Sequence, residues 1–416
     1  MDTKLRSWRI RVFAATWVSY AAYYFCRKPF YISKSVLESE LGWNTELLGI
    51  IGACYLVAYA VGQLTSAWIG DRLGARFLVL SGMAVSAGCN VVFGFTNSWV
   101  MFAVFMTVNG LAQATGWPGN VAAMAEWFRR KERGTVMGFW ATNFQVGGVA
   151  ANGVAAYVLG AYGFRWSFFV GTCVVMATWL FYLFNQRNRP EDVGLERLRD
   201  EGETEESDAI AERDGTSWPR NVWINTLLVG TFYFFIKFIR YAVWSWTPYL
   251  LKRYYEMTPS DAGYLSTAFD VAGIAGVIAV GFLSDRVFRG RRAKVSFFFV
   301  LFMVLACAFL YVLGRHNLWL FGIGIGMIGF FLYGPDALMS GAAAIEVGSR
   351  RSAARAAGII NGMGSVGAVV QELILGRVLA QSGVGTVFGF LVASSLLAAA
   401  CLGALLLRNR SGAADL

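Results

Sequence analysis

The amino-acid sequence predicts an all-α membrane protein whose twelve transmembrane helices form two pseudo-symmetric six-helix bundles. Of 416 residues, 56% are hydrophobic and only 15% are charged, whereas about 25% are charged in soluble domains. Several uncharged stretches reach the roughly 20 residues that cross a bilayer. Basic residues gather in alternate loops, and sequence markers recur at similar spacing in the two halves. These three observations predict the fold class.

Apolar segments of helical length define the expected spans. They cover residues 10–36, 46–70, 76–95, 99–127, 134–160, 166–186, 222–252, 262–284, 294–313, 317–345, 355–380 and 386–407. The segment 187–220 is rich in acidic residues and poor in apolar ones, so we expect a flexible cytoplasmic linker there. The predicted domains are therefore an N-terminal bundle, 1–186, and a C-terminal bundle, 221–416.

The basic loops predict the topology. Arg72, Arg129, Arg286, Arg350 and Arg408 fall on one side when the spans are counted, and the positive-inside rule assigns that side to the cytoplasm. Both termini are expected there, with the first helix retained rather than cleaved as a signal peptide. We expect a multi-pass protein of a bacterial-type inner (plasma) membrane. The formal charge of +10 then reflects topology, and no nucleic-acid partner is expected.

The composition leaves little material for catalysis. His316 is the only histidine, and the six cysteines stand singly in apolar spans. The sequence shows no nucleophile-base pair, metal-ligand cluster or nucleotide-binding loop. It therefore predicts that the protein is not an enzyme and has no cofactor and no metal site.

Two arginines occupy equivalent places in the halves. Arg27 and Arg240 are separated by nearly the same interval as Pro118 and Pro335. Duplicated halves of this kind place a substrate site between them near the bilayer midplane and move by rocking about it. We therefore expect both arginines at one central site.

Charged residues inside membrane spans cost about 2.5–3.5 kcal/mol each on insertion scales and usually mark a path or a site. A guanidinium forms paired hydrogen bonds with phosphate oxygens and stays charged, so Arg27 and Arg240 are expected to bind an anion. The alternative is that each arginine is held by an internal carboxylate. Lys237, one turn before Arg240, is either a third phosphate ligand or a partner of Asp336.

Several motifs together resemble one family. Gly281–Arg286 resembles the loop motif of the major facilitator superfamily. Within that superfamily, five segments in order resemble the organophosphate:phosphate antiporters: Tyr23–Phe30, Gly110–Pro118, Arg189–Leu195, Arg240–Pro248 and Tyr333–Pro335. The resemblance covers nearly the whole chain and implies the major facilitator fold.

The resemblance also implies a function. It implies exchange of a small phosphorylated metabolite, such as a sugar phosphate or a glycerol phosphate, for inorganic phosphate by rocker-switch alternating access. Arg27 and Arg240 would hold the phosphate with tyrosines nearby, and Lys28 and Asp270 would form a gating ion pair. The expected substrate-binding residues are Arg27, Arg240, Lys237, Tyr20, Tyr24, Tyr59, Gln63, Gln145, Tyr333, Asp336 and Glu372.

The sequence departs from the family at the expected site. Gln63 stands where the glycerol-phosphate carrier has a lysine, and Phe144, followed by Gln145, stands where it has a histidine. Asp336 and Glu372 add carboxylates. A substrate that offers hydroxyls or an amine would therefore suit the site better than glycerol-3-phosphate alone. The alternative for both carboxylates is structural pairing with Lys237 or Arg377.

Other functions remain open at this point. The protein could be a transporter-like sensor of external sugar phosphate, or a proton-coupled phosphate-ester symporter that uses Asp336 or Glu372. Efflux of cationic compounds is disfavoured by the two arginines. The expected partners are a small phosphorylated metabolite, inorganic phosphate and membrane lipids, and the chain is expected to act as a monomer.

Overall fold

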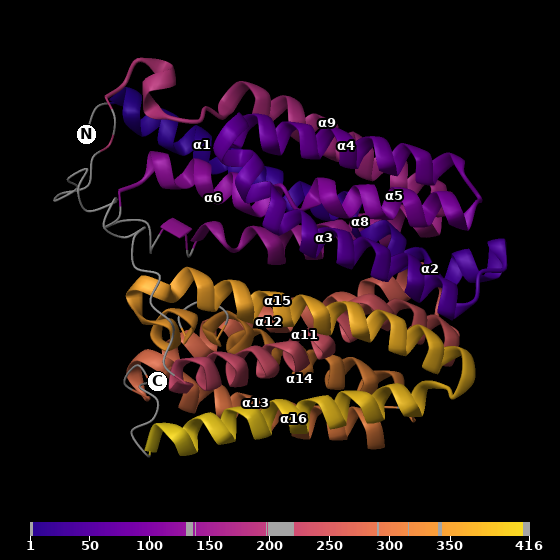
Figure 1. Cartoon of the computed structure of the whole chain (residues 1–416). Coiled ribbons are helices and arrows are strands. Elements are labelled where there is room, and N and C mark those ends of the chain that lie inside the picture. Colours follow the sequence, from indigo (N-terminus) through magenta and orange to yellow (C-terminus); the bar gives the residue numbers. More distant parts are fainter. Residues whose placement is uncertain are drawn as a thin grey trace. The chain divides into compact units, whose positions relative to one another are not determined.

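The computed structural model is helical in the residues that it describes, which are 3–129, 136–137, 139–196, 198, 220–288, 291–314, 316–339 and 343–410. The chain divides into two compact units. The first comprises Met1–Trp43, Cys54–Ala209 and Thr258–Gly263, and the second comprises Asn44–Ala53, Ile210–Met257 and Tyr264–Leu416. Figure 1 shows long helices that run side by side within each unit.

The first unit contains the described helices up to residue 193, except for residues 44–53, which belong to the second unit. They are α1 (Thr3–Tyr23), the short 3-10 helix η1 (Tyr24–Cys26), α2 (Lys28–Leu41), α3 (Thr45–Leu73), α4 (Ala75–Phe95), α5 (Trp99–Gln113), α6 (Gly116–Trp127), α8 (Asn143–Tyr162), α9 (Phe164–Asn185) and η2 (Pro190–Val193). Gly74 separates α3 from α4 and Gly163 separates α8 from α9, both with positive φ angles. Glycine adopts this conformation without the penalty that a side chain imposes, so tight turns form at these two points.

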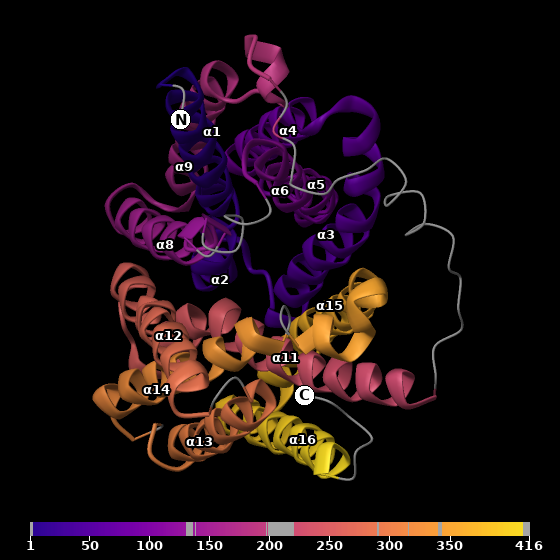
Figure 2. The ribbon, with the colours of Figure 1, turned by 90° about the vertical axis from the view of Figure 1, so that its left-hand side faces the viewer.

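Among the described residues after 219, six long helices lie in the second unit, except for residues 258–263, which belong to the first. They are α11 (Arg220–Tyr255), α12 (Pro259–Arg286), α13 (Arg292–Val312), α14 (Leu318–Ala337), α15 (Ala343–Gln381) and α16 (Val384–Arg410). The side chain of Asn317 accepts a hydrogen bond of 2.7 Å from the backbone N–H of Trp319 and so caps the start of α14. Figure 2 shows the same helices with the left-hand side of Figure 1 turned toward the viewer.

Ten helices of the described chain are long and apolar enough to cross a membrane. The expected span 10–36 is broken into α1, η1 and α2, with Arg27 in the break. The expected span 99–127 is broken into α5 and α6, of 15 and 12 residues, at Ala114 and Thr115. The all-α membrane architecture is thus confirmed, while the number of twelve spans stays a prediction. Both breaks lie beside residues of the candidate site.

Glycines bring α12 and α14 together at backbone distance in the second unit. A side chain at Gly276 of α12 would meet the carbonyl oxygen of Phe330, and one at Gly329 of α14 would meet the carbonyl oxygen of Phe269. The two helices therefore approach reciprocally, each through a glycine of its own, as small residues permit in membrane proteins. This packing holds the C-terminal end of α14 beside the middle of α12.

The close approach of α12 and α14 predicts that alanine destabilises the protein at the contact glycines and not at a glycine outside the contact. Gly276→Ala and Gly329→Ala should each lower the midpoint of thermal unfolding in detergent, because overpacking costs about 1–3 kcal/mol. Gly281→Ala, further along α12, is the matched control, since no atom lies within 4 Å of a side chain added there. Equal midpoints for all three variants would show that the helices do not pack as described.

Candidate functional site

Arg27 stands in the break between η1 and α2 rather than within a continuous helix. Its backbone N–H donates a hydrogen bond of 3.1 Å to the carbonyl oxygen of Tyr24, which closes the turn. Pro29 lies at the start of α2, where a missing N–H costs nothing. Arg27 is 6% exposed. The turn therefore presents a nearly buried guanidinium from a point where the backbone leaves its helical path.

Three tyrosine rings surround this guanidinium. The distances from Arg27 Cζ to the ring centroids are 4.9 Å for Tyr24, 5.2 Å for Tyr55 and 5.0 Å for Tyr59. Tyr24 belongs to η1, and the other two lie one turn apart on α3. Aromatic faces attract a cation through their quadrupoles, and the attraction grows when water is excluded. The rings stabilise the positive charge without neutralising it.

The hydrogen-bond acceptor for Arg27 is the neutral amide of Gln113 at the end of α5. Arg27 Nε donates to Gln113 Oε1 at 2.9 Å, and the Tyr55 hydroxyl donates to the same oxygen at 2.8 Å. Gly110, one turn earlier, lets α5 approach α3, because a side chain there would meet the Tyr55 carbonyl oxygen. Gln113 Nε2 donates to Ser86 Oγ at 3.1 Å. Its amide oxygen is thereby turned toward Arg27.

Further buried amides anchor the turn that carries Arg27. Asn90 of α4 and Asn109 of α5 each donate a hydrogen bond of 3.1 Å to the carbonyl oxygen of Cys26. Ser86 Oγ donates to Asn109 Oδ1 at 2.6 Å, and Gln113 Nε2 donates to that oxygen at 3.2 Å. Asn90, Asn109, Ser86 and Gln113 are fully buried. A connected polar network in a low-dielectric interior restricts its members to one arrangement.

The charge of Arg27 is not compensated by a carboxylate. Across the part of the chain that the structure describes, Arg27 makes no ion pair, and its hydrogen bond goes to Gln113. The expected alternative, in which an internal carboxylate holds the arginine, is therefore not found for Arg27. The hydrogen bond of this guanidinium to Gln113 uses Nε, so its two terminal nitrogens remain available as donors.

Other expected residues of the first unit join this cluster. The hydroxyls of Tyr20 and Tyr59 lie 3.4 Å apart, and Gln63 Nε2 donates to the Tyr59 hydroxyl at 3.1 Å. Gln145 of α8 is 8% exposed, and its Nε2 is buried without a hydrogen-bond partner. Gly148, one turn further along α8, lies beside the ring of Tyr24. The structure thus brings Tyr20, Tyr59 and Gln63 to Arg27 and places Gln145 on the helix face nearby.

Arg240 lies within α11 in the second unit and has a charged partner. Its Nη1 donates to Asp336 Oδ2 at 2.6 Å, and its Cζ lies 4.7 Å from the ring centroid of Tyr333. Asp336 follows Pro335 near the end of α14 and is 5% exposed. Its second oxygen, Oδ1, is buried without a hydrogen-bond partner. The internal carboxylate that we considered as an alternative is therefore present for Arg240.

Lys237 and Asp270 complete this second cluster. The Lys237 ammonium lies 5.1 Å from the ring centroid of Tyr233 and 5.6 Å from that of Tyr241. The Tyr333 hydroxyl donates to Asp270 Oδ1 of α12 at 2.5 Å. The structure therefore joins Arg240, Tyr333, Asp336 and Asp270 within one unit, and Lys237 lies one turn from Arg240 on α11. Lys28, the expected gating partner of Asp270, is a buried residue of the first unit, and their pairing stays a prediction.

Glu372 of α15 is fully buried and accepts hydrogen bonds from neutral donors. Ser245 Oγ lies 2.8 Å from Oε1, while Trp246 Nε1 and Gln371 Nε2 each lie 2.9 Å from Oε2. Ser245 and Trp246 belong to α11, so these bonds join α11 to α15. This geometry favours a structural role for Glu372. Its direct contact with a substrate stays a prediction.

Sequence reasoning did not single out Tyr55, Gln113 or Trp246. Gln113 stands inside the motif Gly110–Pro118, where a polar residue in an apolar span was the available signal. Tyr55 precedes the expected Tyr59 by one helical turn, so its orientation could have been inferred from the helical period. No sequence pattern pairs Trp246 with Glu372, because the two lie on helices far apart in the chain.

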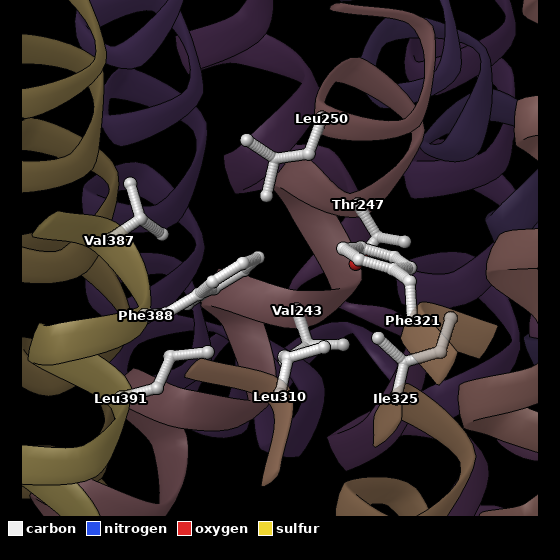
Figure 3. A pocket seen from close by; sticks show the side chains of 10 residues that line it. Val243, Thr247, Leu250, Leu310, Phe321, Ile325, Val387, Phe388 and Leu391 are labelled. Atoms are coloured by element: carbon white, nitrogen blue, oxygen red, sulfur yellow. The ribbon is translucent and has the colours of Figure 1, made fainter. Parts of the chain in front are cut away.

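A pocket of the second unit differs from both clusters. It lies among α11, α13, α14 and α16 (Figure 3), and its labelled lining is apolar except for the hydroxyl of Thr247. The lining residues are Ala242, Val243, Thr247, Leu250, Leu310, Phe321, Ile325, Val387, Phe388 and Leu391. A phosphorylated ligand would find no cation in that lining, so the arginine clusters are the better candidates for an anion site.

Comparison with known proteins gives one family. The model of the Major Facilitator Superfamily matches residues 13–236 and 228–415. The chain is 29% identical to a probable hexose phosphate transport protein of Chlamydia pneumoniae, with 90% of this chain and 86% of that protein covered. It is 28% identical to the glycerol-3-phosphate transporter of Bacillus subtilis, with 96% and 92% covered. It is 29% identical to a glucose-6-phosphate exchanger of Danio rerio, with 98% and 94% covered.

Solved structures share the fold. A bacterial homolog of the human lysosomal transporter Spinster, in an inward-facing and occupied conformation, superposes with a TM-score of 0.76 at 14% identity and covers the whole of both chains. A mutant of the nucleoside transporter NupG superposes with a TM-score of 0.71 at 12% identity, with 95% of this chain and 99% of that chain covered. Identities this low support the fold and not the substrate.

The hydrogen bonds of Glu372 predict that its loss destabilises the second unit. Glu372→Leu should lower the midpoint of thermal unfolding by several degrees, because each buried donor left without an acceptor costs about 1–3 kcal/mol. Glu372→Gln is the matched variant, since it keeps an amide oxygen for Ser245 or Trp246 and should unfold closer to the unmodified protein. If Glu372→Leu unfolds at the unmodified midpoint, the carboxylate does not join α11 to α15.

Proposed function

This chain belongs to the Major Facilitator Superfamily and, within it, to the organophosphate:phosphate antiporter family. From this membership we propose a transport function for the chain. It is a multi-pass membrane transporter of phosphorylated metabolites rather than an enzyme. In our proposal it exchanges a small organophosphate, such as a sugar phosphate or a glycerol phosphate, for inorganic phosphate by rocker-switch alternating access.

The guanidinium of Arg27 is the observation that carries the proposal. Arg27 is only 6% exposed, and the partners of its guanidinium among the described residues are an amide and three aromatic rings. A charge held inside a membrane protein without an opposite charge marks a ligand path or site. A phosphate can accept two hydrogen bonds from the planar guanidinium and also supplies the negative charge that balances it.

The names of the relatives support the substrate class. Hexose phosphate, glycerol-3-phosphate and glucose-6-phosphate are all phosphate monoesters of small hydroxylated molecules. The hydroxyls of Tyr20, Tyr24 and Tyr59, and the amides of Gln63 and Gln145, are suitable partners for phosphate oxygens and sugar hydroxyls. In the second unit we propose Lys237, Arg240, Tyr333 and Asp336 as ligands, and Lys28 and Asp270 as gating residues.

Exchange follows from the charge of Arg27. A conformation that shields this guanidinium from water is costly when the site is empty and becomes accessible when a bound phosphate supplies the opposite charge. Inorganic phosphate and a phosphate monoester present the same oxygens, so either can permit the change of conformation. In our proposal one therefore enters as the other leaves. We further propose twelve spans in an inner membrane, with both termini in the cytoplasm.

Proteoliposomes test exchange directly. Purified protein is reconstituted into vesicles loaded with unlabelled phosphate, and uptake of labelled phosphate is followed with and without internal phosphate. Uptake that requires internal phosphate and is inhibited by external hexose or glycerol phosphates would support the antiporter. Phosphate binding without any uptake would instead favour a transporter-like sensor, and uptake independent of internal phosphate would favour a symporter.

Arg27→Lys should reduce phosphate exchange strongly, although it keeps the positive charge. The ammonium lacks the planar fork, and losing one charge-assisted hydrogen bond costs about 1.5–3 kcal/mol, or about tenfold to hundredfold in affinity. The same change at Arg240 should also reduce exchange. Arg165→Lys is the matched control, because Arg165 contacts the Gly94 carbonyl oxygen and Asn97 near the start of α9. Near-normal exchange by both Arg27→Lys and Arg240→Lys would refute the arginine site.

A further inference from the structure

The two arginines of the proposed site have chemically different partners. Arg27 donates to the amide of Gln113, which ends α5, and Arg240 donates to the carboxylate of Asp336, which lies near the end of α14. The helices α5 and α14 fall within the fourth expected span of their respective halves. The corresponding span of each half therefore supplies the acceptor, although Gln113 lies five residues before Pro118 and Asp336 directly follows Pro335. The acceptor is neutral for Arg27 and anionic for Arg240.

The neutral partner of Arg27 is held in place from behind. Gln113 Nε2 donates to Ser86 Oγ and to Asn109 Oδ1, so the amide cannot rotate without breaking both bonds. The amide oxygen therefore points toward Arg27 Nε, and no negative charge reaches the guanidinium from the described residues. Arg27 is in this way kept oriented and electrostatically unsatisfied before any ligand arrives.

Arg240, by contrast, already has an anion beside it. Asp336 Oδ2 lies 2.6 Å from Arg240 Nη1, and Asp336 is 5% exposed. A phosphate that approaches Arg240 meets a carboxylate of the same sign, so it must share the guanidinium or displace Asp336. Part of the attraction between Arg240 and phosphate is therefore cancelled for as long as the ion pair persists.

The surroundings of Asp336 provide another cation if the ion pair opens. Lys237 lies one turn before Arg240 on α11, with its ammonium 5.1 Å from the ring centroid of Tyr233. Tyr333, on the same helix as Asp336, donates to Asp270 of α12. The helix α13 packs against α14 with apolar residues such as Val295 and Phe299. Lys237, three residues before Arg240, is thus a cation that could pair with Asp336 when Arg240 binds a ligand.

We propose that the two arginines act at different steps: Arg27 captures the phosphate, and Arg240 engages it only after Asp336 releases the guanidinium. This proposal rests on the proposed transport of organophosphates and adds a division of labour within it. Gln113 is then the residue that keeps the capturing arginine active, and Asp336 is the residue that restrains the second one. At this step both act by positioning an arginine.

Two charge-changing variants test the division in the full-length protein. Gln113→Glu gives Arg27 the kind of partner that Arg240 has, so the dissociation constant for inorganic phosphate should rise about tenfold or more. Asp336→Asn removes the restraint on Arg240, so phosphate should bind several-fold more tightly than to the unmodified protein. Binding is measured with labelled inorganic phosphate in detergent, and the exchange rate is measured in proteoliposomes. Asp336→Asn should exchange more slowly despite its tighter binding.

Controls separate this proposal from general damage. Asn185→Asp adds a carboxylate at the half-buried last residue of α9 and should bind phosphate as the unmodified protein does. Thermal unfolding without ligand shows whether each variant is folded, and if Asp336→Asn does not fold, Gln113→Glu decides alone. A merely structural role for Asp336 would weaken phosphate binding and not tighten it.

The outcomes that overturn the proposal are distinct from those that overturn the function. Unchanged phosphate affinity in folded Gln113→Glu, or weaker binding in folded Asp336→Asn, would overturn the division of labour while leaving organophosphate transport in place. If the unmodified protein neither binds phosphate nor exchanges it, the proposed function is lost and the division of labour is lost with it.

Discussion

The structure around the candidate site depends on one constraint: a guanidinium removed from water must be stabilised, and the way it is stabilised decides what it can still bind. Arg27 is stabilised by tyrosine faces and by the oxygen of Gln113. Those partners lower the cost of burial and leave a net positive charge. Arg240 is stabilised by Asp336, whose carboxylate compensates the positive charge of Arg240. The two guanidiniums thus have different electrostatic surroundings and different capacities to bind an anion.

The same constraint explains where the helices break. The turn between η1 and α2 points Arg27 away from the regular helix surface, and the carbonyl oxygen of Cys26, freed by that turn, accepts hydrogen bonds from Asn90 and Asn109. Backbone that leaves the helical path inside a membrane must find partners within the protein, because lipid offers none. The fully buried amides of α4 and α5 meet that need and orient Gln113 at the same time. Helix geometry and site chemistry are therefore parts of one network.

The sequence predicted the all-α membrane class and identified Arg27 and Arg240 as charges that require a function. It did not predict the breaks in the spans 10–36 and 99–127, because apolar composition continues through both turns and a hydropathy pattern cannot register a change of backbone path. It also could not predict that Arg27 meets Gln113 while Arg240 meets Asp336. Those partners lie far away in the chain, and both arginines had the same two alternatives. Packing between helices, such as the approach of Gly110 to α3, selects one partner from several polar side chains.

The difference between the two partners suits a carrier that must release what it binds. Two uncompensated arginines would hold a phosphate dianion so strongly that release would become slow, whereas two arginines paired with carboxylates would give a ligand little reason to bind. In the proposed division of labour, one arginine of each kind gives an intermediate affinity for phosphate. A ligand changes a conformational equilibrium only through its unequal affinity for the two states, and an ion pair that opens in one state creates that inequality. A duplicated fold can therefore keep an arginine in both halves and still make the halves unequal, because one arginine meets an amide and the other a carboxylate.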